Sequence, residues 1–301
     1  MYLIFDTETT GLPKNFNAPL SDFDNWPRVV QLAWQLHDSE GKLLEVKNYI
    51  VKPEGFTIPY NAEQIHGIST ERALREGMPL AYVLAEFNLA LEKASFSVGH
   101  NISFDINVLG SEYLRMEMET HLHDKRVIDT KDETTDWCAI PGGKGGKFKW
   151  PTLTELYEKL FGESFAEAHN ASADVEATTR AFLESLRKGI ISAEKAGLSP
   201  VQFKAFQHAN PDVVHLIGLQ IQPYQPEPAE QPQPSAPAKV SAKSKKELTT
   251  APYAHLHNHT QYSVLQSTTE VKKLVQKAIA DKMPAVGLTD SGNMMAAFHF
   301  V

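Results

Sequence analysis

A proline-rich stretch divides this chain and limits how it can fold. Six prolines fall within the fifteen residues 223–237, interleaved with glutamine, alanine and glutamate. A segment with so few large apolar side chains cannot form a hydrophobic core, so we expect an extended linker over residues 218–252. The sequence therefore predicts a folded domain at 1–188, a helical appendage at 189–217 and the start of a second domain at 253–301.

The first predicted domain has the pattern of an α/β protein. Strands are predicted at Tyr2–Glu8, Arg28–His37 and Leu43–Val51, and a short turn between the last two makes them an antiparallel hairpin. The later predicted elements are a helix at Pro79–Ala94, a strand at Ser95–His100, a helix at Phe104–Met116 capped by Ser103, a strand at Val127–Thr130, and helices at Thr152–Gly162 and Ser172–Lys188. A meander followed by alternating strands and helices predicts a mixed central β-sheet flanked by helices.

The composition narrows the class of protein. The single cysteine, Cys138, argues against an internal disulfide or a cysteine-based zinc site and is typical of a reducing, cytoplasmic location. No apolar run reaches the roughly 18 residues of a membrane-spanning helix, so no membrane partner is expected. The net charge is −8, and residues 1–188 hold 29 acidic against 19 basic side chains. Taken alone, this balance disfavours a nucleic acid partner.

Two carboxylates stand close together on the first predicted strand. In the segment Phe5-Asp6-Thr7-Glu8, the alternation of a strand directs Asp6 and Glu8 to the same face. The apolar residues 3–5 indicate a central strand, where two neighbouring carboxylates repel each other. The pair becomes useful when a divalent cation lies between the two groups. The motif therefore predicts a metal site, against the alternative of a solvated edge strand with outward acids.

Two later motifs each place an acid in the first turn of a predicted helix. Asp105 follows a buried strand, and Asp174 follows His169 with four residues between them. The helix macrodipole favours an anion in a first turn, and the His-x4-Asp spacing can bring an imidazole and a carboxylate to one site. Each motif alone has a structural alternative, either a simple first-turn acid or a His–Asp pair that supports packing. For His100, at the end of the strand, we expect a packing role.

Taken in order along the chain, the three motifs are far more specific than any one alone. They resemble the DEDDh family of 3′–5′ exonucleases, most closely the proofreading epsilon subunits of bacterial DNA polymerase III, over residues 1–188. The supporting matches are Ile65-His66-Gly67-Ile68, Asp129-Thr130 and the helix start Thr152-Leu153-x-x-Leu156. The resemblance implies a ribonuclease H-like exonuclease fold.

Four carboxylates and one histidine make up the predicted catalytic set. Phosphodiester hydrolysis needs an activated water, charge relief on the phosphoryl group and a stabilised leaving oxygen, which two divalent cations can supply together. Mg²⁺ and Mn²⁺ prefer carboxylate and water ligands, so two such cations are expected. The predicted metal ligands are Asp6, Glu8, Asp105 and Asp174. His169 is the candidate base that accepts the proton of the attacking water, and the resemblance implies the same role.

The resemblance also implies which residues hold the terminal nucleotide. By their places in the first motif, these are Thr9, Thr10 and Gly11. Asn101 and Phe104 match the second motif and are expected to shape the same site.

Residues 141–150, with the sequence PGGKGGKFKW, form a second candidate contact for nucleic acid. The segment combines three lysines with two aromatic residues and four glycines. It is not a P-loop, because Pro141 stands where the first glycine should be and Phe148 follows Gly146-Lys147. The lysines could contact phosphates while the rings stack on bases. The alternative is an ordinary solvated surface loop.

Alternating histidines mark the last segment, 253–301. The predicted elements there are a strand at Tyr253–Tyr262, a helix at Glu270–Lys282 and a strand at Ala285–Asp290. The segment resembles the start of the PHP domain of bacterial DNA polymerase III alpha subunits, in which His257 and His259 match the His-x-His ligands and Asp290 the Thr-Asp position. Ser291 stands where metal-binding members often have histidine, which argues against a bound metal. Because a PHP domain is several times longer than this segment, we expect the truncated start of a larger polypeptide or a cloned fragment of one, against the alternative of a His-rich tail without function.

Together these features predict a metal-dependent 3′–5′ exonuclease that releases nucleoside monophosphates from DNA 3′ ends. The expected partners are DNA 3′ ends and the alpha subunit of DNA polymerase III, joined in the same polypeptide. A tether raises the effective concentration of the two parts, so a weak contact between them would suffice for proofreading. Two alternatives stay open: an RNA 3′-end-processing exonuclease of the same fold, and a non-catalytic module that binds a polymerase.

Overall fold

The chain divides into two units, Met1–Pro226 and Glu227–Val301, and each is described by itself. The computed structural model describes residues 1–163, 165, 171–212, 258–261 and 269–289. The predicted linker at 218–252 lies outside these described residues.

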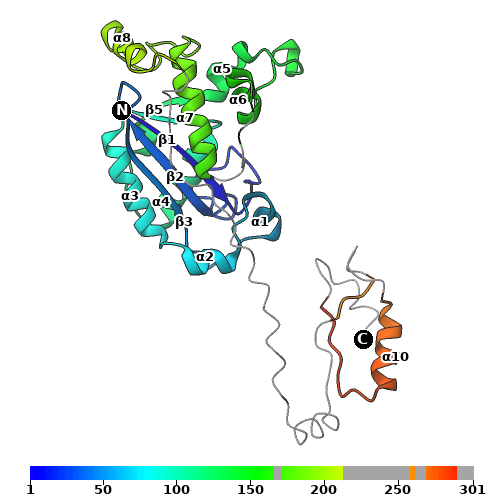
Figure 1. The fold of residues 1–301 in the computed structure, drawn as a ribbon. Coiled ribbons are helices and arrows are strands. Elements are labelled where there is room, and N and C mark those ends of the chain that lie inside the picture. The colour runs from blue at the N-terminus through cyan, green and yellow to red at the C-terminus, as the bar shows by residue number, and fades with distance from the viewer. Residues whose placement is uncertain (164, 166–170, 213–257, 262–268, 290–301) are drawn as a thin grey trace, which may run out of the picture. The chain divides into compact units, whose positions relative to one another are not determined.

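A five-stranded sheet lies at the centre of the first unit, in the order β3-β2-β1-β4-β5 (Figure 1). Its strands are β1 (Tyr2–Thr9), β2 (Val29–His37), β3 (Leu43–Ile50), β4 (Phe96–Gly99) and β5 (Arg126–Asp129). The first three strands are antiparallel neighbours, while β4 runs parallel to both β1 and β5. The predicted mixed sheet is confirmed, and β1 is its central strand.

The predicted hairpin between β2 and β3 is also present. Asp38 Oδ1 accepts hydrogen bonds from the backbone N–H groups of Glu40 and Lys42, at 2.9 Å each. Gly41 adopts φ 83°, which glycine reaches without the strain that a Cβ atom would cause. The turn therefore has the side chain and the glycine that its backbone requires.

Helices cover both faces of the sheet (Figure 1). They are α3 (Leu80–Lys93) and α4 (Ser103–Arg115) on one face and α7 (Ala171–Arg187) on the other. Leu3 and Phe5 of β1 pack in the cluster with α3 and α4, whereas Tyr2 and Ile4 pack in the cluster with α7. Both faces of the first half of β1 are therefore apolar, as its central position requires.

The remaining helices of this unit are short. They are α1 (Tyr60–His66), α2 (Thr70–Glu76), α5 (Thr130–Cys138), α6 (Leu153–Phe161) and α8 (Pro200–Ala209), with 3₁₀ turns at Leu122–Asp124 and Lys144–Gly146. The capping box predicted for α6 is confirmed, since Thr152 and Glu155 each accept a hydrogen bond from the other's backbone N–H. The helices α1, α2 and α5 have only seven to nine residues, so their apolar periodicity is too short to recognise.

Two local predictions are wrong. Ser103 does not cap α4, because it is the first residue of the helix and Ile102 stands at the cap position. The chain enters this helix through Asn101, which has a left-handed backbone with φ 66°. Thr130 begins α5 instead of ending the strand, because Asp129 at the cap accepts a hydrogen bond from the Lys131 backbone N–H at 3.0 Å.

The segment after α7 packs on the same core. Ile191, Ala196 and Phe206 join the apolar cluster that holds Tyr2 and Ile4. The Tyr2 hydroxyl donates a hydrogen bond to the Ala196 carbonyl oxygen at 2.8 Å. The described part of the predicted helical appendage therefore contributes to the core under β1.

In the second unit, the described residues contain the helix α10 (Val271–Ala280), which falls within the predicted helix. The Thr289 backbone N–H donates to the Asn258 carbonyl oxygen at 2.9 Å. Residues 285–289 do not form the regular strand predicted there. His257, Asp290 and Ser291 lie outside the described residues, so the expectation that Ser291 disfavours a bound metal stays a prediction.

No helix in the described part of the chain is long and apolar enough to cross a bilayer.

Candidate active site

The carboxyl end of β1 carries the first two predicted ligands. Asp6 and Glu8 continue the alternation that places Ile4 under α7, so both side chains lie on that face of the sheet. The residue opposite Asp6 on β2 is Ala33, whose small side chain leaves space beside the carboxylate. The apolar half of the strand anchors it in the core, and its last residues carry the charge.

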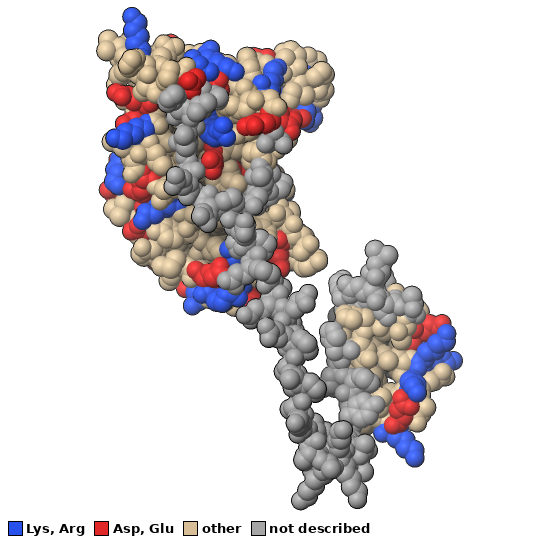
Figure 2. All heavy atoms as spheres, viewed as in Figure 1, with Lys and Arg blue, Asp and Glu red and all other residues tan. Residues whose placement is uncertain are grey.

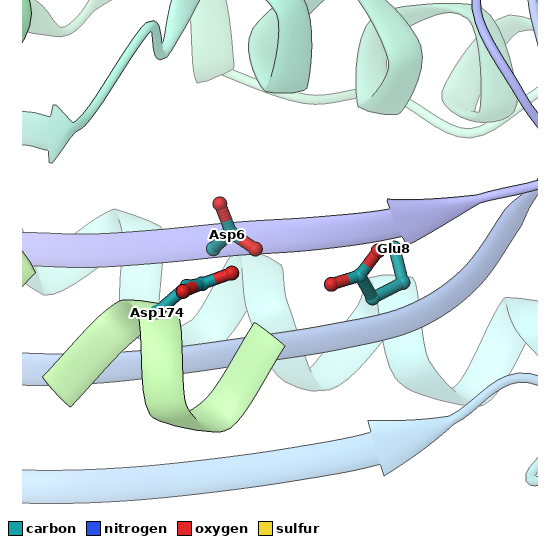
Figure 3. A group of neighbouring side chains, drawn as sticks. All are labelled: Asp6, Glu8 and Asp174. Carbon is teal, nitrogen blue, oxygen red and sulfur yellow. The ribbon is translucent and has the colours of Figure 1, made fainter. Parts of the chain in front are cut away.

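Asp174 reaches the same place from the first turn of α7. Carboxylate oxygens of Asp6, Glu8 and Asp174 all lie within 4.8 Å of one another. Figure 3 shows the three side chains converging from the strand and the helix. The helix can approach so closely because Ala171 and Val175, on its inner face, pack in the cluster with Ile4.

Asp105 is the fourth predicted acid, and it lies buried in the first turn of α4. Its Oδ1 atom accepts hydrogen bonds from the Thr7 backbone N–H at 3.0 Å and from the Thr7 hydroxyl at 2.6 Å. Thr7 stands between Asp6 and Glu8 on β1, so one strand both carries two acids and holds a third. Three of the four predicted carboxylates therefore meet at the end of β1, and Asp105 lies near enough to raise the pKa of Asp6.

Burial and mutual repulsion make these carboxylates unusually basic. Burial raises the pKa of Asp6 well above its ordinary value, and repulsion from its three acidic neighbours raises it further. The same causes raise the pKa of Glu8 to about 8. Burial raises the pKa of Asp105 to about 7, even though the hydrogen bonds from Thr7 act in the opposite direction. Such values are typical of acids assembled around a charge that the chain itself does not supply.

This donor set fits a divalent cation. The charged groups that shift the pKa values of Asp6 and Glu8 are all carboxylates, so within the described residues no lysine or arginine offsets their repulsion. Carboxylate oxygens are the ligands that Mg²⁺ and Mn²⁺ prefer. The cluster Asp6, Glu8 and Asp174, with Asp105 beside it, could hold such an ion.

A pocket of about 300 Å³ opens beside the acids. Its lining includes Asp6 and Asp174 on one side and Thr152, Leu153 and Phe165 on another. The site is therefore reached from the side on which α6 begins.

His100 also lines this pocket, but both of its ring nitrogens lie against other protein groups. Nδ1 is 3.0 Å from the Thr130 hydroxyl, and Nε2 is 3.0 Å from the Pro151 carbonyl oxygen. Burial lowers the pKa of His100 to about 4, so its ring is neutral at physiological pH. These contacts agree with the packing role expected for it.

The residues expected to hold the nucleotide fall into two groups. Thr9, Thr10 and Gly11 follow the acids directly: the Thr9 hydroxyl donates to the Gly11 carbonyl oxygen at 2.7 Å, and the Thr10 hydroxyl accepts from the Arg28 backbone N–H at 3.0 Å. Asn101 and Phe104 flank the start of α4. Phe104 is half-buried against the core cluster of α3 and α4. Their roles toward a nucleotide stay predictions.

His169, the predicted base, lies outside the described residues. Two residues of the site had no role assigned from the sequence, Thr7 and Asp129. Asp129 Oδ1 accepts a hydrogen bond from the Asn101 backbone N–H at 2.9 Å and so fixes the turn that leads to Asp105. Neither role is visible in sequence, because a threonine on a strand and an acid before a helix are common without such a contact.

A third residue without an assigned role is His66, at the end of α1. It is buried, and this burial lowers its pKa to about 4, although a hydrogen bond with the Thr9 backbone acts in the opposite direction. The sequence had marked His66 only as part of a family match. Its Nδ1 atom accepts a hydrogen bond from the Ile68 backbone N–H at 3.1 Å.

Charges of both signs are interspersed on the face of the first unit shown in Figure 2. That view shows no broad basic patch over the described residues.

Comparisons with known proteins agree with this geometry. Residues 3–182 match the family described as Exonuclease, and residues 255–301 match the PHP domain. The predicted pairing of an exonuclease domain with a PHP segment is confirmed.

Two kinds of polymerase are among the relatives. The DNA polymerase III PolC-type of Pediococcus pentosaceus is 27% identical over 225 residues, which cover 72% of this chain and 14% of that protein. The DNA polymerase III subunit alpha of Saccharopolyspora erythraea is 49% identical over 49 residues, or 16% of this chain and 4% of that protein. This chain therefore spans only a small part of the length of these relatives.

Solved structures of exonuclease I share the fold. One matches with a TM-score of 0.50 and 24% identity, covering 69% of this chain and 44% of that one. Another, of E. coli exonuclease I in complex with a dT13 oligonucleotide, has a TM-score of 0.50 and 23% identity and covers 71% and 45% of the two chains. The predicted ribonuclease H-like fold is confirmed. Because the Exonuclease match covers more than half of the sequence, the chain belongs to the exonuclease family.

Proposed function

We propose that this chain is a metal-dependent 3′–5′ exonuclease that removes nucleoside monophosphates from DNA 3′ ends. The observation that carries the proposal is the meeting of Asp6, Glu8 and Asp174 within 4.8 Å at the end of the central strand. A purely structural role does not account for three partly buried acids of which two, Asp6 and Glu8, have pKa values raised by burial and by their acidic neighbours. Membership of the exonuclease family supports the same reaction.

Two divalent cations, Mg²⁺ or Mn²⁺, are proposed as cofactors. Asp6, Glu8, Asp105 and Asp174 would hold them, and when bound the ions would activate the water and stabilise charge on the phosphoryl group. Deprotonated carboxylates are needed for this, so binding releases the protons that the raised pKa values of Glu8 and Asp105 retain. Thr7 keeps Asp105 in place because its backbone N–H and its hydroxyl both donate hydrogen bonds to Asp105 Oδ1.

His169 is proposed as the base that takes the proton from the attacking water. It precedes Asp174 by a short span of chain, so the two side chains can act at one site. Thr9, Thr10 and Gly11 would hold the terminal nucleotide, with Asn101 and Phe104 beside it. The Arg28 backbone and His66 keep the segment after β1 in a defined conformation.

The biological role that fits best is proofreading for DNA polymerase III. The relatives of the first part of the chain include PolC-type polymerases, and those of the last part include alpha subunits. An exonuclease and a polymerase joined in one polypeptide would act at a high effective concentration of each other. The single cysteine supports a cytoplasmic location for this work.

The test is hydrolysis of 3′-labelled DNA, single-stranded and with a paired or mispaired 3′ end, by the purified chain with Mg²⁺ or Mn²⁺. We expect mononucleotide products, faster release from the mispaired end and no activity after chelation. Asp6→Asn should abolish the release. Asp124→Asn, which changes an exposed acid outside the acidic cluster, should not. Equal rates for Asp6→Asn and wild type would refute the assignment of the site.

Two alternative functions use the same fold. An RNA 3′-end-processing enzyme would hydrolyse a matched RNA oligonucleotide much faster than DNA, because the 2′-hydroxyl is the discriminating group. A non-catalytic polymerase-binding module would show neither metal binding nor hydrolysis. The intact set of four acids disfavours the second alternative.

A further inference from the structure

The segment between α5 and α6 presents an unusual surface. Its base is closed by a hydrogen bond from the Lys149 backbone N–H to the Ile140 carbonyl oxygen, at 2.8 Å. Beyond this bond the loop carries two large exposed rings, Phe148 at 45% and Trp150 at 63% exposure. Two large aromatic rings two residues apart thus remain in contact with water. Burying them against a ligand would be favourable, and the fold itself does not bury them.

The loop encloses a pocket of about 900 Å³. The charged residues that line it are Lys144, Lys147, Lys149 and Asp136. Lys149 forms an ion pair with Glu155 at 2.7 Å. Within the described residues Lys144 and Lys147 form no ion pair, so two ammonium groups remain to meet an anion.

The glycines of the loop leave room for a ligand's backbone. Gly142, Gly145 and Gly146 all have positive φ, and a Cβ atom added at any of them would meet nothing within 4 Å. The surface therefore offers cations, ring faces and open space together. This combination suits a single nucleic acid strand, since lysines meet phosphates and every base has a face that can stack.

Two observations connect this surface with the pocket that contains the carboxylates. Lys131 Nζ lies 4.7 Å from the centre of the Trp150 ring and donates a hydrogen bond to Asn101 Oδ1 at 2.8 Å. Two residues after Trp150, Thr152 lines the small pocket that contains Asp6. A strand whose 3′ end lies at the acids can therefore reach the loop along the protein surface.

We propose that residues 141–150, together with Lys131, bind the single DNA strand that leads to the scissile end. In this arrangement Trp150 and Phe148 stack on bases, and Lys144 and Lys147 contact phosphates. The proposal rests on the proposed exonuclease function, for which it supplies a substrate contact beyond the terminal nucleotide. It also explains how a chain with net charge −8 can hold DNA.

Equilibrium binding to the full chain tests this surface. A fluorescent oligothymidylate of about 12 nucleotides, a length suited to such a surface, is titrated in chelator so that no hydrolysis occurs. We expect Trp150→Ala to weaken binding about tenfold, the loss of one stacking contact. The double variant Lys144→Ala/Lys147→Ala should lower the slope of log affinity against log salt by about 0.7 for each lysine.

Matched controls lie on other parts of the first unit. Lys204→Ala, at an exposed lysine of α8, should leave the salt slope unchanged, and Tyr82→Ala, at an exposed ring of α3, should leave the affinity unchanged. Thermal unfolding of each variant, expected to match wild type, verifies folding, and Phe148→Ala is a second aromatic probe. Wild-type affinity and salt slope in all three loop variants would overturn the proposal.

Two further outcomes separate this proposal from others. Oligouridylate that binds at least tenfold more tightly than oligothymidylate through Trp150 would overturn DNA as the occupant and favour RNA. Hydrolysis is measured in parallel with Mg²⁺. If the wild type binds DNA through the loop but hydrolyses nothing, the proposed function alone is refuted. If the wild type hydrolyses DNA and the loop variants bind it as tightly as wild type, the proposed role of the loop alone is refuted.

Discussion

Glu112 is fully and Glu8 is partly shielded from water in the same domain, but their surroundings are opposite. Glu112, on α4, is fully buried and forms ion pairs with Arg28 at 2.9 Å and with Arg115 at 3.2 Å. It also accepts a hydrogen bond from the Val29 backbone N–H at 2.9 Å. The charges that act on Glu8 are those of other carboxylates.

The difference indicates that Glu112 stabilises the fold, whereas Glu8 is placed to bind a ligand. A buried charge is costly unless it is paired, and the fold supplies two arginines and a backbone donor to Glu112. The charged groups that shift the pKa of Glu8 are carboxylates, and protons or an added cation would relieve their repulsion. An acid whose neutralising charge is missing from the described residues around it marks a place for a ligand.

The hydrolysis rate should show the largest contrast between the two residues. Glu8→Gln removes a proposed metal ligand and should lower the rate of mononucleotide release by at least about 1,000-fold. Glu112→Gln, the same substitution at the structural acid, should keep the rate within a few-fold of wild type at a temperature where the variant is folded. Both rates are measured with Mn²⁺ on one single-stranded DNA. Similar losses in the two variants would break the comparison.

Stability should show the reverse contrast. Glu112→Gln leaves two partly buried arginines without their acid, so its free energy of unfolding should fall by about 3 kcal/mol. Glu8→Gln, in chelator, removes repulsion and should not lower that free energy at all. Urea denaturation of both variants at pH 8 measures the difference. A Glu8→Gln protein that loses as much stability as Glu112→Gln would show that Glu8 has a structural partner.

The strand pattern and the acids could be predicted from sequence because both are local. Alternation along Tyr2–Glu8 determines which side chains share a face, and the Thr152–Glu155 box defines the start of a helix within four residues. Such signals do not depend on the rest of the chain.

The contact of Arg28 with Glu112 could not be predicted, because 84 residues separate the two. In sequence, Glu112 reads as a surface acid on a helix. The hydrogen bonds from Thr7 to Asp105 span 98 residues and are hidden in the same way. The sequence therefore predicted which acids gather at the site, but the contacts that position them depend on how β1 and α4 pack.

The stability of the metal-free protein should depend on pH in the direction that the raised pKa values require. Glu8 has an ordinary pKa of 4.5 that the fold raises to about 8, so the folded state binds the proton more tightly than the unfolded state. The associated stability is present below pH 4.5 and is lost as the pH rises to about 8. We expect a loss of about 1 to 2 kcal/mol, reduced by solvent screening.

Melting curves in chelator from pH 5 to pH 8 measure this loss, with Glu8→Gln as the matched control that should reduce it, since Asp6 and Asp105 still titrate. Added Mn²⁺ should stabilise the wild type more at pH 8 than at pH 5, because protons compete with the ion at low pH. A metal-free wild type that becomes more stable with rising pH over this range would contradict the assignment.

The smallest expected effect concerns Thr7. Its hydrogen bond to Asp105 gives a proposed metal ligand a structural donor, as the Val29 backbone does for Glu112. Thr7→Val removes the hydroxyl that donates to Asp105 at 2.6 Å and should cost about 1 kcal/mol of stability. Thr134→Val, which removes a buried hydroxyl donor on α5, should cost a similar amount.

Only Thr7→Val should change metal binding. Loss of a hydrogen bond to the charged form raises the pKa of Asp105 above about 7, so protons compete better with Mn²⁺ near neutral pH. Calorimetric titration at pH 7 should show a few-fold weaker affinity that recovers by about pH 9, because no proton then occupies the carboxylate. A deficit that persists unchanged at high pH would instead mean that Thr7 sets the position of Asp105 and not its charge.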